Sequence, residues 1–513
     1  MYGRGRSGEA SLKLDRKMKL ALLFLSALLA VEAGPAQKRE SRSGKLLVCY
    51  YGSWAVYRPG DGKFDVEQID PTLCTHLVFG FAGLSYENKI HALDPWNELV
   101  DEWGSGKDAY RRFNALKTVN PGMKTILAIG GWNEGSTKYS QMAADPAKRA
   151  TFVTSCVDFL QKYGFDGLDM DWEYPANRGG TPADKVSTLR PPPDANFVQL
   201  LRELKAAFRP HGLLLTAAVS AGKSTIDTAY DVPAMAESLD IISVMVYDMH
   251  GAWEPFTHHN APLYAHPLDQ SGDNRYFNAN YSMRYWLSLG APREKLVMGM
   301  PTYGRGFSLD RPEENGFYAP ASQAGMAGPY TREAGILGFN EICEIQKQYG
   351  DFQRHWNHDV KVPYCTFNSR QWFGYDDIES ISLKAQLIVD LNLAGGMVWS
   401  VETDDFRGKC GLGNNPILNA IKRVLDGGHV EATTADSSVT STTGTSTTST
   451  SAPSPSTTSS GQGECSHAGF GLRITASGHK LPPNVDAESL SPESQIKTLK
   501  RFRVRSSKSR KEL

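Results

Sequence analysis

The chain has 513 residues, which is enough for two to four domains of ordinary size or for one large barrel with additional segments. Its 40% hydrophobic content and ten Trp residues exclude a chain that is disordered throughout. The 55 Lys and Arg residues balance the 56 Asp and Glu residues, and a net charge of −1 argues against a protein that coats nucleic acid or an anionic membrane.

The first element in chain order is the apolar segment Leu20 to Val31, which follows two lysines. Its length of about twelve residues is too short to cross a bilayer. Val31 and Ala33 are small or apolar, as a signal peptidase requires before a cleavage after Ala33. We therefore expect residues 1–33 to be a secretory signal peptide, with translation starting at Met1 or Met18, rather than a buried helix. The mature chain would be extracellular and free of the membrane.

From Lys45 to about residue 425, short apolar runs alternate with amphipathic stretches. Eight runs have the length of buried strands: Leu46–Tyr51, His76–Phe81, Lys124–Trp132, Gly167–Glu173, Leu213–Val219, Ile241–Tyr247, Lys295–Met300 and Gly396–Trp399. Helical patterns lie at Tyr110–Val119, Pro146–Tyr163, Asn196–Phe208, Met283–Leu289, Leu383–Leu391 and Pro416–Leu425. This alternation predicts an α/β fold, a (β/α)8 TIM barrel over residues 45–425. An open doubly wound sheet is the alternative, but no Gly-rich phosphate loop follows the first run.

An insertion separates the seventh and eighth runs, which lie almost 100 residues apart. Residues 304–376 are rich in Gly, Tyr, Phe and Pro and contain one helical pattern near Phe339–Gln348. A single loop and helix need far fewer residues. We therefore expect a small α+β subdomain beside the mouth of the barrel.

The composition changes after residue 428. Ser or Thr occupies 21 of the 28 positions from Thr433 to Ser460, which predicts a Ser/Thr-rich, O-glycosylated linker over residues 429–460. Residues 461–513 contain one Cys and a basic end, and we expect a disordered tail. Its charge run is better explained as a solvated segment than as a nucleic-acid or heparin patch.

The strongest chemical signal is an acidic segment in the fourth run, Asp166-Gly-Leu-Asp169-Met-Asp171-Trp-Glu173. Side chains alternate along a strand, so Asp169, Asp171 and Glu173 share one face and the apolar residues between them share the other. In a barrel the apolar face packs on the helices, and the three carboxyls point inward, about 6.6 Å apart at Cα. Glu173 then lies nearest the C-terminal mouth, where the active sites of such barrels lie.

Three carboxyls in one confined column cannot all ionise cheaply, because each negative charge raises the pKa of its neighbours. We expect at least one to stay protonated near neutral pH. Glu173 at the rim is the one that a substrate can reach, so it is the candidate general acid. The alternatives are an edge strand with a solvated acidic face and a divalent-cation site.

The placement of the carboxyls on one strand limits the reaction. An ordinary glycosidase needs two carboxyls that flank the scissile bond, whereas these three approach from one side. Asp171 is badly placed to attack the opposite face of a sugar ring. A 2-acetamido sugar can instead use its own carbonyl oxygen as the nucleophile, and Asp171 would then stabilise the acetamide N–H.

Aromatic residues cluster near the predicted strand ends. Sugar rings present apolar C–H faces that stack on such side chains, so a groove floored by Trp and Tyr suits an extended polysaccharide. The aromatic residues at these ends are Tyr50, Trp54, Phe81, Trp132, Trp172, Tyr174, Tyr247, Trp253, Tyr303 and Trp399.

Five motifs resemble those of the secreted animal chitinases of glycoside hydrolase family 18. They are the acidic segment through Tyr174, Gly130-Gly131-Trp132-Asn133, Met245-Val246-Tyr247-Asp248, Pro301-Thr302-Tyr303-Gly304-Arg305 and Met397-Val398-Trp399. The resemblance covers residues 45–425. It implies an endochitinase that cleaves β-1,4 bonds between N-acetylglucosamine units with retention of configuration, through an oxazolinium intermediate.

The resemblance also implies roles for single residues. Glu173 is implied as the acid/base, Asp171 as the partner of the acetamide, Asp169 as its support, and Tyr247 and Asp248 as the groups that hold the acetamide carbonyl. The implied substrate-binding residues are Tyr50, Trp54, Phe81, Trp96, Gly130, Gly131, Trp132, Asn133, Tyr174, Met245, Val246, Trp253, Tyr303, Arg305, Met397 and Trp399.

The implied partners are chitin and N-acetylglucosamine oligomers, bound by a monomer without a metal ion or organic cofactor and without nucleic acid. Two alternatives stay open: a chitin-binding, lectin-like protein without turnover, and an endo-β-N-acetylglucosaminidase that acts on N-glycans. The lectin-like members usually lack the acid Glu, which is present here as Glu173.

Seven Cys residues leave at least one thiol outside intramolecular pairs. Cys49 and Cys74 lie on or beside neighbouring strands, so a bridge is geometrically reasonable, and the resemblance agrees. Cys343 and Cys410 are the expected second pair, and Cys156 and Cys365 are expected to be free. The remaining Cys465 resembles the start of a six-Cys chitin-binding module that the chain does not continue. Asn280 heads an Asn-Tyr-Ser sequon and is the expected N-glycosylation site.

Overall fold

The computed structural model describes residues 44–428, apart from residues 101–102, 182–183 and 185–194. The predicted signal peptide, linker and basic tail, with Cys465, lie outside the described residues. In the described part, no helix is both long and apolar enough to cross a membrane.

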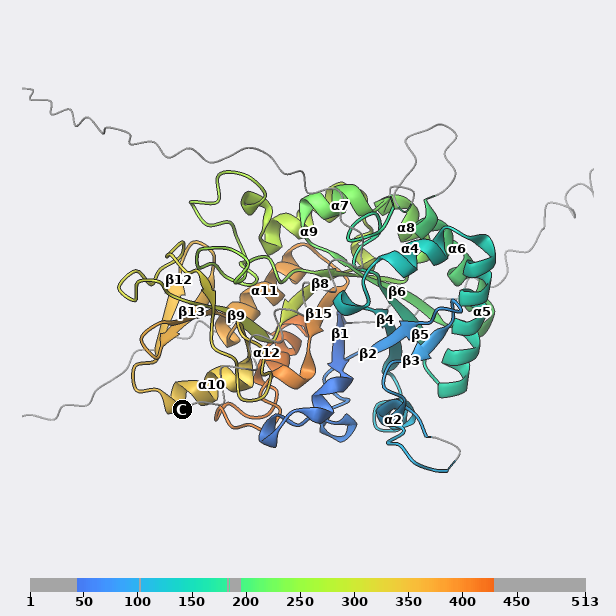
Figure 1. Ribbon diagram of the computed structural model, residues 1–513, viewed down its shortest axis with the longest axis horizontal. Helices are drawn as coiled ribbons and strands as arrows, with labels where there is room; N and C mark the ends of the chain where they lie inside the picture. Colours follow the sequence, from blue (N-terminus) through green and yellow to red (C-terminus); the bar gives the residue numbers. More distant parts are fainter. Residues whose placement is uncertain (1–43, 101–102, 182–183, 185–194, 429–513) are drawn as a thin grey trace, which may run out of the picture. The chain divides into compact units, whose positions relative to one another are not determined.

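Eight parallel strands form a closed barrel (Figure 1). They are β1 (Leu46–Gly52), β2 (His76–Leu84), β4 (Lys124–Gly130), β5 (Gly167–Asp171), β6 (Leu214–Ser220), β7 (Ile241–Met245), β8 (Leu296–Pro301) and β15 (Gly395–Trp399). Each strand pairs with the next along the chain, and β1 closes the barrel because it pairs with both β2 and β15. The short strand β3 (Ile90–Ala92) extends β2 as an antiparallel hairpin. The predicted α/β TIM barrel is confirmed.

Helices cover the outside of the barrel (Figure 1). They are α2 (Pro95–Glu98), α3 (Ala109–Ala115), α4 (Thr137–Ala143), α5 (Pro146–Tyr163), α6 (Asn196–Phe208), α7 (Lys223–Ala229), α8 (Val232–Ser238), α9 (Ala279–Ser288), α11 (Ile378–Asp390) and α12 (Pro416–Leu425). Local sequence explains the bounds of α5: the Asp145 side chain accepts hydrogen bonds from two backbone N–H groups of the first turn, and Gly164 ends the helix with a left-handed φ.

The two faces of β5 pack against different surroundings. Leu168, Met170 and Trp172 are buried in the large apolar cluster between the strands and the helices. Asp169 and Asp171 face the interior of the barrel, where a smaller cluster of inward-facing side chains includes Val48, Ile126 and Val297. The strand alternation inferred from the acidic segment is therefore present in the structure.

A second, antiparallel sheet lies between β8 and β15, on the left in Figure 1. It consists of β9 (Tyr303–Ser308), β10 (Gln323–Ala324), β11 (Ile336–Gly338), β12 (Gln353–Asn357), β13 (Val362–Phe367) and β14 (Gln371–Gly374), with α10 (Phe339–Gln348) beside it. Strand β9 follows β8 after one residue, so the insertion begins at the mouth of the barrel and its first strand carries Tyr303 and Arg305.

The expected cysteine pairs are present. Cys49–Cys74 joins β1 to the residues before β2, and Cys343–Cys410 joins α10 to the segment after β15. Cys156 and Cys365 are free and buried, as expected. The disulfides therefore tie together segments that are separated by 25 and 67 residues in the sequence.

Candidate active site

The three predicted carboxyls lie at the C-terminal end of β5. Asp169 and Asp171 are the third and last residues of the strand, and Glu173 follows it. Gly130 and Gly131, at the end of β4, let this segment approach closely: the N–H of Gly131 donates to the carbonyl oxygen of Asp171 over 2.8 Å. A Cβ at Gly130 would lie only 2.1 Å from that oxygen. The two glycines therefore set the packing beneath the carboxyls.

Asp169 is fully buried and held by two hydroxyl groups. The Tyr50 hydroxyl donates to Oδ2 over 2.8 Å, and the Thr216 hydroxyl donates to Oδ1 over 2.5 Å. Burial raises the pKa of Asp169 to about 6, although both hydrogen bonds oppose this rise. The side chain is thus fixed in orientation and titrates close to neutral pH.

Asp171 lies between the other two carboxyls and is 4% exposed. Its pKa is raised well above the ordinary value, first by burial and then by the neighbouring charges of Glu173 and Asp169. Its Oδ1 atom is buried and has no hydrogen-bond partner among the described residues. A buried carboxyl oxygen without a donor is costly, so this atom is suited to accept a hydrogen bond from a substrate N–H.

Glu173 reaches the mouth and is only partly exposed. Its pKa is raised to about 7: burial is the largest cause, the Tyr174 hydroxyl and the positive Arg178 lower the pKa, and the negative charge of Asp248 adds to the rise. A carboxyl with this pKa is protonated in a large fraction of molecules near neutral pH. It can therefore donate a proton and accept one later in the same reaction.

A second polar group follows β7. Tyr247 is half-buried, and its hydroxyl has only a long contact of 3.6 Å with the sulfur of Met397. Asp248 has a left-handed φ of 56° and accepts hydrogen bonds at Oδ1 from the Tyr303 hydroxyl and from Nε of Arg305, both over 2.6 Å. The insertion strand β9 therefore fixes Asp248, whereas the Tyr247 hydroxyl is available to a ligand.

Three aromatic rings form a floor at the mouth. Trp54 follows β1, Phe81 lies within β2 and Trp399 ends β15, and their ring centroids lie 5.7 to 6.2 Å apart. Phe81, Trp399, Met245 and Tyr247 all pack on the inner barrel cluster. Trp54 is 43% exposed, so the floor presents apolar surface to solvent beside the carboxyls.

A hollow of about 340 Å³ adjoins this floor. Trp54 and Trp399 line one part of it, Asp248, Tyr303 and Arg305 line another, and the remaining wall comes from residues 57–59, 330–333, 336, 400 and 402–403. Glu402 is buried in this wall and accepts hydrogen bonds from the Ser400 hydroxyl and the Gly52 N–H, so it joins the ends of β15 and β1. The hollow has the size of a sugar-binding cleft.

Other predicted contact residues lie farther out. Trp132 is 59% exposed and Trp253 is 58% exposed, and each carries an arginine over its ring: Arg178 over Trp132 and Arg305 over Trp253. Asn133 is exposed beside Trp132. Trp96 lies on α2 next to Tyr57, with ring centroids 6.4 Å apart. Trp96 is therefore at the periphery of the site rather than at the carboxyls.

Several predicted contact residues are buried. Tyr50, Val246 and Met397 are each at most 1% exposed, so they line the site from behind. Tyr50 supports Asp169 instead of presenting its hydroxyl to the groove. Tyr50 and Met397 pack in the inner barrel cluster and Val246 in the cluster between the strands and the helices, so direct sugar contact by these three residues stays a prediction.

Sequence reasoning missed Thr216, Ser136 and Arg178. Thr216 interrupts the apolar run of β6 and pairs in register with Asp169, so a lone hydroxyl in a buried strand was its available signal. The Ser136 hydroxyl accepts from the Trp172 indole and donates to the Tyr174 carbonyl, which fixes the backbone on both sides of Glu173. Neither Ser136 nor Arg178 has a local signal, because both act across separate loops.

One cluster of possible metal ligands occurs among the described residues, at Cys343, Asp405 and Cys410. Both sulfur atoms belong to a disulfide, so they are not available as ligands. Asn280, the predicted glycosylation site, is the second residue of α9 and is half-buried. Its side-chain oxygen accepts from Nε of Arg284 over 2.9 Å.

Comparisons with known proteins agree with this geometry. The chain matches the model of "Glycosyl hydrolases family 18" over residues 46–404. It is 43% identical over 416 residues to probable chitinase 2 of Drosophila melanogaster, covering 79% of this chain and 81% of that protein. The crystal structure of Ostrinia furnacalis Group IV chitinase superimposes with a TM-score of 0.69 at 45% identity, covering 74% of this chain and 99% of that chain.

A further similar structure belongs to a pseudo-chitinase. Human YKL-39, described as a pseudo-chitinase with retained chitooligosaccharide binding, superimposes with a TM-score of 0.66 at 38% identity, covering 74% of this chain and 99% of that chain. The barrel, its buried carboxyls and its aromatic floor define a carbohydrate-active TIM barrel. Together with the match over residues 46–404, they show that the chain belongs to glycoside hydrolase family 18.

Proposed function

We propose that this protein is a secreted chitinase that hydrolyses β-1,4 bonds between N-acetylglucosamine units with retention of configuration. The observation that carries the proposal is the pair formed by Asp171 and Glu173. A buried carboxyl oxygen without a donor lies beside a carboxyl whose pKa is about 7. The first is suited to an acetamide N–H and the second to the glycosidic oxygen, and a 2-acetamido sugar offers both atoms.

In the first step, the acetamide carbonyl oxygen attacks C1 of its own sugar. The bond between C1 and the glycosidic oxygen breaks, and Glu173 gives its proton to that oxygen. Asp171 accepts a hydrogen bond from the acetamide N–H and stabilises the positive charge of the resulting oxazolinium ring. Asp169 holds Asp171 in place, and the Tyr247 hydroxyl donates to the acetamide oxygen.

In the second step, water attacks C1 from the side that the leaving sugar vacated. The Glu173 carboxylate takes the proton from this water, and the bond between C1 and the acetamide oxygen breaks. Two displacements at one carbon restore the original configuration. Trp54, Phe81, Trp399, Trp132 and Trp253 would bind neighbouring sugars along the groove through their exposed faces.

The most direct test is the substitution Glu173→Gln, which removes the acid but keeps the size of the side chain. We expect the kcat for N-acetylglucosamine oligomers to fall by about 10³-fold or more, because no group then protonates the leaving oxygen. Oligomer binding, measured by calorimetry, should remain. The exposed Glu313→Gln, in the insertion, is the matched control and should behave as the unmodified protein.

Three outcomes would contradict the proposal. Unchanged turnover in Glu173→Gln would show that another group is the acid. Binding without turnover in the unmodified protein would place it with YKL-39 as a pseudo-chitinase, the second candidate that the comparisons support. Release of the reducing core sugar from a high-mannose glycopeptide, with no cleavage of chitin oligomers, would instead indicate an endo-β-N-acetylglucosaminidase.

A further inference from the structure

The loop after β5 places a positive charge at the mouth of the barrel. Arg178 is exposed, and its guanidinium donates two hydrogen bonds of 3.0 Å, one to the carbonyl oxygen of Glu173 and one to the carbonyl oxygen of Trp132. These carbonyls belong to the loops that follow β5 and β4. A planar group with several donors can bridge two such acceptors, whereas an ammonium group cannot do so with the same geometry.

The same guanidinium covers one face of the Trp132 indole. Its central carbon lies 3.3 Å from the ring centroid, which is a stacking distance. Trp132 is nevertheless 59% exposed, so the opposite face of the ring remains open to a sugar. One side chain therefore holds the plane of a groove tryptophan and the backbone of the candidate acid at the same time.

The backbone of this loop is itself constrained. Ala176 and Arg178 both have left-handed φ values, 60° and 51°, which are unfavourable for residues other than glycine. The buried Asp184 accepts hydrogen bonds from the Thr181 N–H and the Ser140 hydroxyl, and so anchors the loop to α4. On the other side of Arg178, the Ser136 hydroxyl donates to the Tyr174 carbonyl, so contacts on both sides maintain the strain, which is typical of a conformation with a functional role.

The charges around Glu173 explain why a cation at this position matters. Asp171 and Asp248 place negative charge near the carboxyl, and the tyrosine hydroxyls of Tyr174, Tyr230 and Tyr247 surround it. The positive charge of Arg178 opposes these negative charges and lowers the pKa of Glu173. Without it, the acid would keep its proton to a higher pH.

We propose that Arg178 is a positioning residue of the hydrolysis reaction: it fixes the Trp132 ring and the Glu173 backbone relative to each other and places a positive charge beside the acid. The proposal rests on the proposed function of Glu173. The geometric role and the charge of Arg178 can be tested separately. A lysine keeps the positive charge but lacks the planar set of N–H donors of the guanidinium, and a methionine lacks both.

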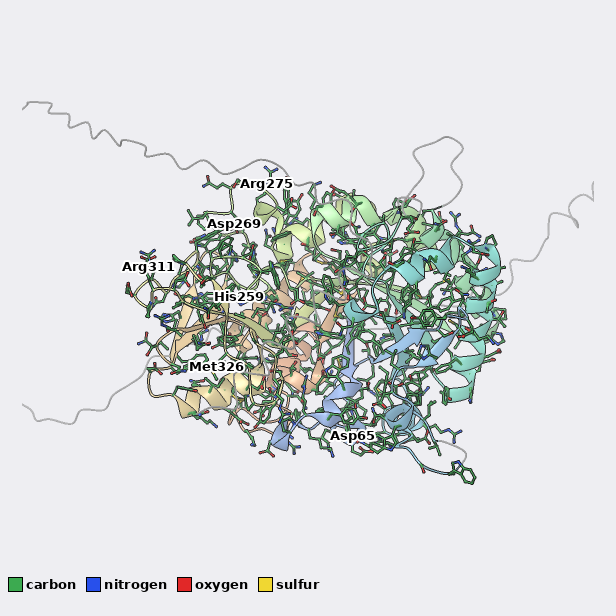
Figure 2. All side chains as sticks on the ribbon, in the orientation of Figure 1. Asp65, His259, Asp269, Arg275, Arg311 and Met326 are labelled. Carbon is green, nitrogen blue, oxygen red and sulfur yellow. A yellow bond between two sulfur atoms is a disulfide. The ribbon has the colours of Figure 1, made fainter. Side chains whose placement is uncertain are left out.

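The experiment uses Arg178→Met and Arg178→Lys in the full chain, with Arg311→Met as the matched control. Arg311 lies at the outer edge of the insertion (Figure 2), and its side chain is 56% exposed. The pH dependence of kcat/KM and the separate values of kcat and KM are measured with soluble N-acetylglucosamine oligomers. Thermal melting checks that each variant folds.

We expect Arg178→Met to shift the alkaline limb of the kcat/KM profile to higher pH by about half a pH unit and to raise KM about threefold. Arg178→Lys should raise KM similarly, because the planar set of N–H donors is lost. It should leave the alkaline limb at the same pH, because the positive charge is kept. Arg311→Met should change neither. The proposal is overturned if Arg178→Met leaves both the limb and KM unchanged, or if Arg178→Lys moves the limb as much as Arg178→Met.

Failure of the proposed function gives a different result. If the unmodified protein shows no turnover, the function is wrong, and the geometric statement is then tested by oligomer binding. In that case Arg178→Met and Arg178→Lys should each weaken oligomer binding about threefold. Equal affinities in all variants would overturn the positioning role.

Discussion

The two ends of β5 carry the same residue type in opposite environments. Asp166, just before the strand, accepts hydrogen bonds from the Thr125 N–H and from Nζ of Lys117, each over 2.9 Å, and Lys124 lies 3.7 Å away. These contacts outweigh its burial and lower its pKa. Asp171, at the other end, has no such cation among the residues that the structure describes, and burial and its acidic neighbours raise its pKa.

The two environments give the two ends of β5 different roles, one in stability and one in chemistry. At the N-terminal end of the barrel the negative charge is compensated, so Asp166 stabilises the contact between β4, β5 and the segment after α3. At the C-terminal mouth, the carboxyls of Asp169, Asp171 and Glu173 have no cationic side chain at hydrogen-bond distance within the described part of the chain, which costs stability and leaves their pKa values raised. A barrel strand can therefore carry both roles within six residues, from Asp166 to Asp171.

Of the effects on activity that follow from this comparison, the largest is expected for the substitution Asp171→Asn. We predict that kcat for chitin oligomers falls about 10²- to 10³-fold, because the oxazolinium charge loses its counter-charge. The same change should raise the melting temperature by about 1–3 °C at pH 8. Because folding raises the pKa of this carboxyl, its ionisation destabilises the native protein as pH rises above the ordinary pKa of 3.8.

Thermal melting at pH 3 is the control for Asp171→Asn, because both states are then protonated and the stability gain should vanish. Activity and stability that fall together at pH 8 would contradict the account. That result would mean that the carboxyl is compensated in the same way as Asp166.

The pH profile is the next largest effect. Glu173 must be protonated to act as the acid, and burial raises its pKa to about 7. We therefore expect kcat/KM to fall roughly tenfold per unit as the pH rises above about 7. Initial rates on a soluble oligomer from pH 5 to 9 measure this limb. Activity that increases between pH 7 and 9 would exclude Glu173 as the proton donor.

The smallest effect is expected at the other end of the strand. Asp166→Asn should lower stability by about 1–2 kcal/mol, since it removes the charge that Lys117 and Lys124 contact, and should leave kcat and KM unchanged. The lowered pKa of Asp166 means that its contribution is present above its ordinary value of 3.8 and is lost as pH falls. Denaturant unfolding at pH 7 and pH 3 should show a larger difference at pH 7 than at pH 3. A fall in kcat with unchanged stability would contradict the assignment of Asp166 to stability and not to chemistry.

The sequence was sufficient to predict the barrel because its strands are short apolar runs and its helices have strong boundary signals. The bounds of α5, α6 and α12 agree with the predicted ranges residue for residue. The strand ends were less certain: β5 ends at Asp171 and β7 at Met245, two residues before the predicted ends at Glu173 and Tyr247. Periodicity continues into the loops at the mouth, where hydrogen bonds between strands stop.

The site was predictable where one segment carries the chemistry and not where distant segments meet. Asp169, Asp171 and Glu173 follow from the alternation of one strand. The support of Asp169 by Tyr50 joins residues 119 positions apart, and the Asp248–Arg305 contact joins residues 57 apart. Periodicity within a segment contains no information about such pairs. The burial of Tyr50, Val246 and Met397 depends equally on the closure of the barrel.

The order in which product anomers appear tests the central claim most directly. The unmodified protein is incubated with a short N-acetylglucosamine oligomer, and the anomeric protons of the new reducing ends are followed by NMR before they equilibrate. Substrate-assisted hydrolysis with Glu173 as acid/base predicts that the β-anomer appears first, because configuration is retained. An initial excess of the α-anomer would show that water attacks directly and would contradict the roles proposed for Asp171 and Glu173.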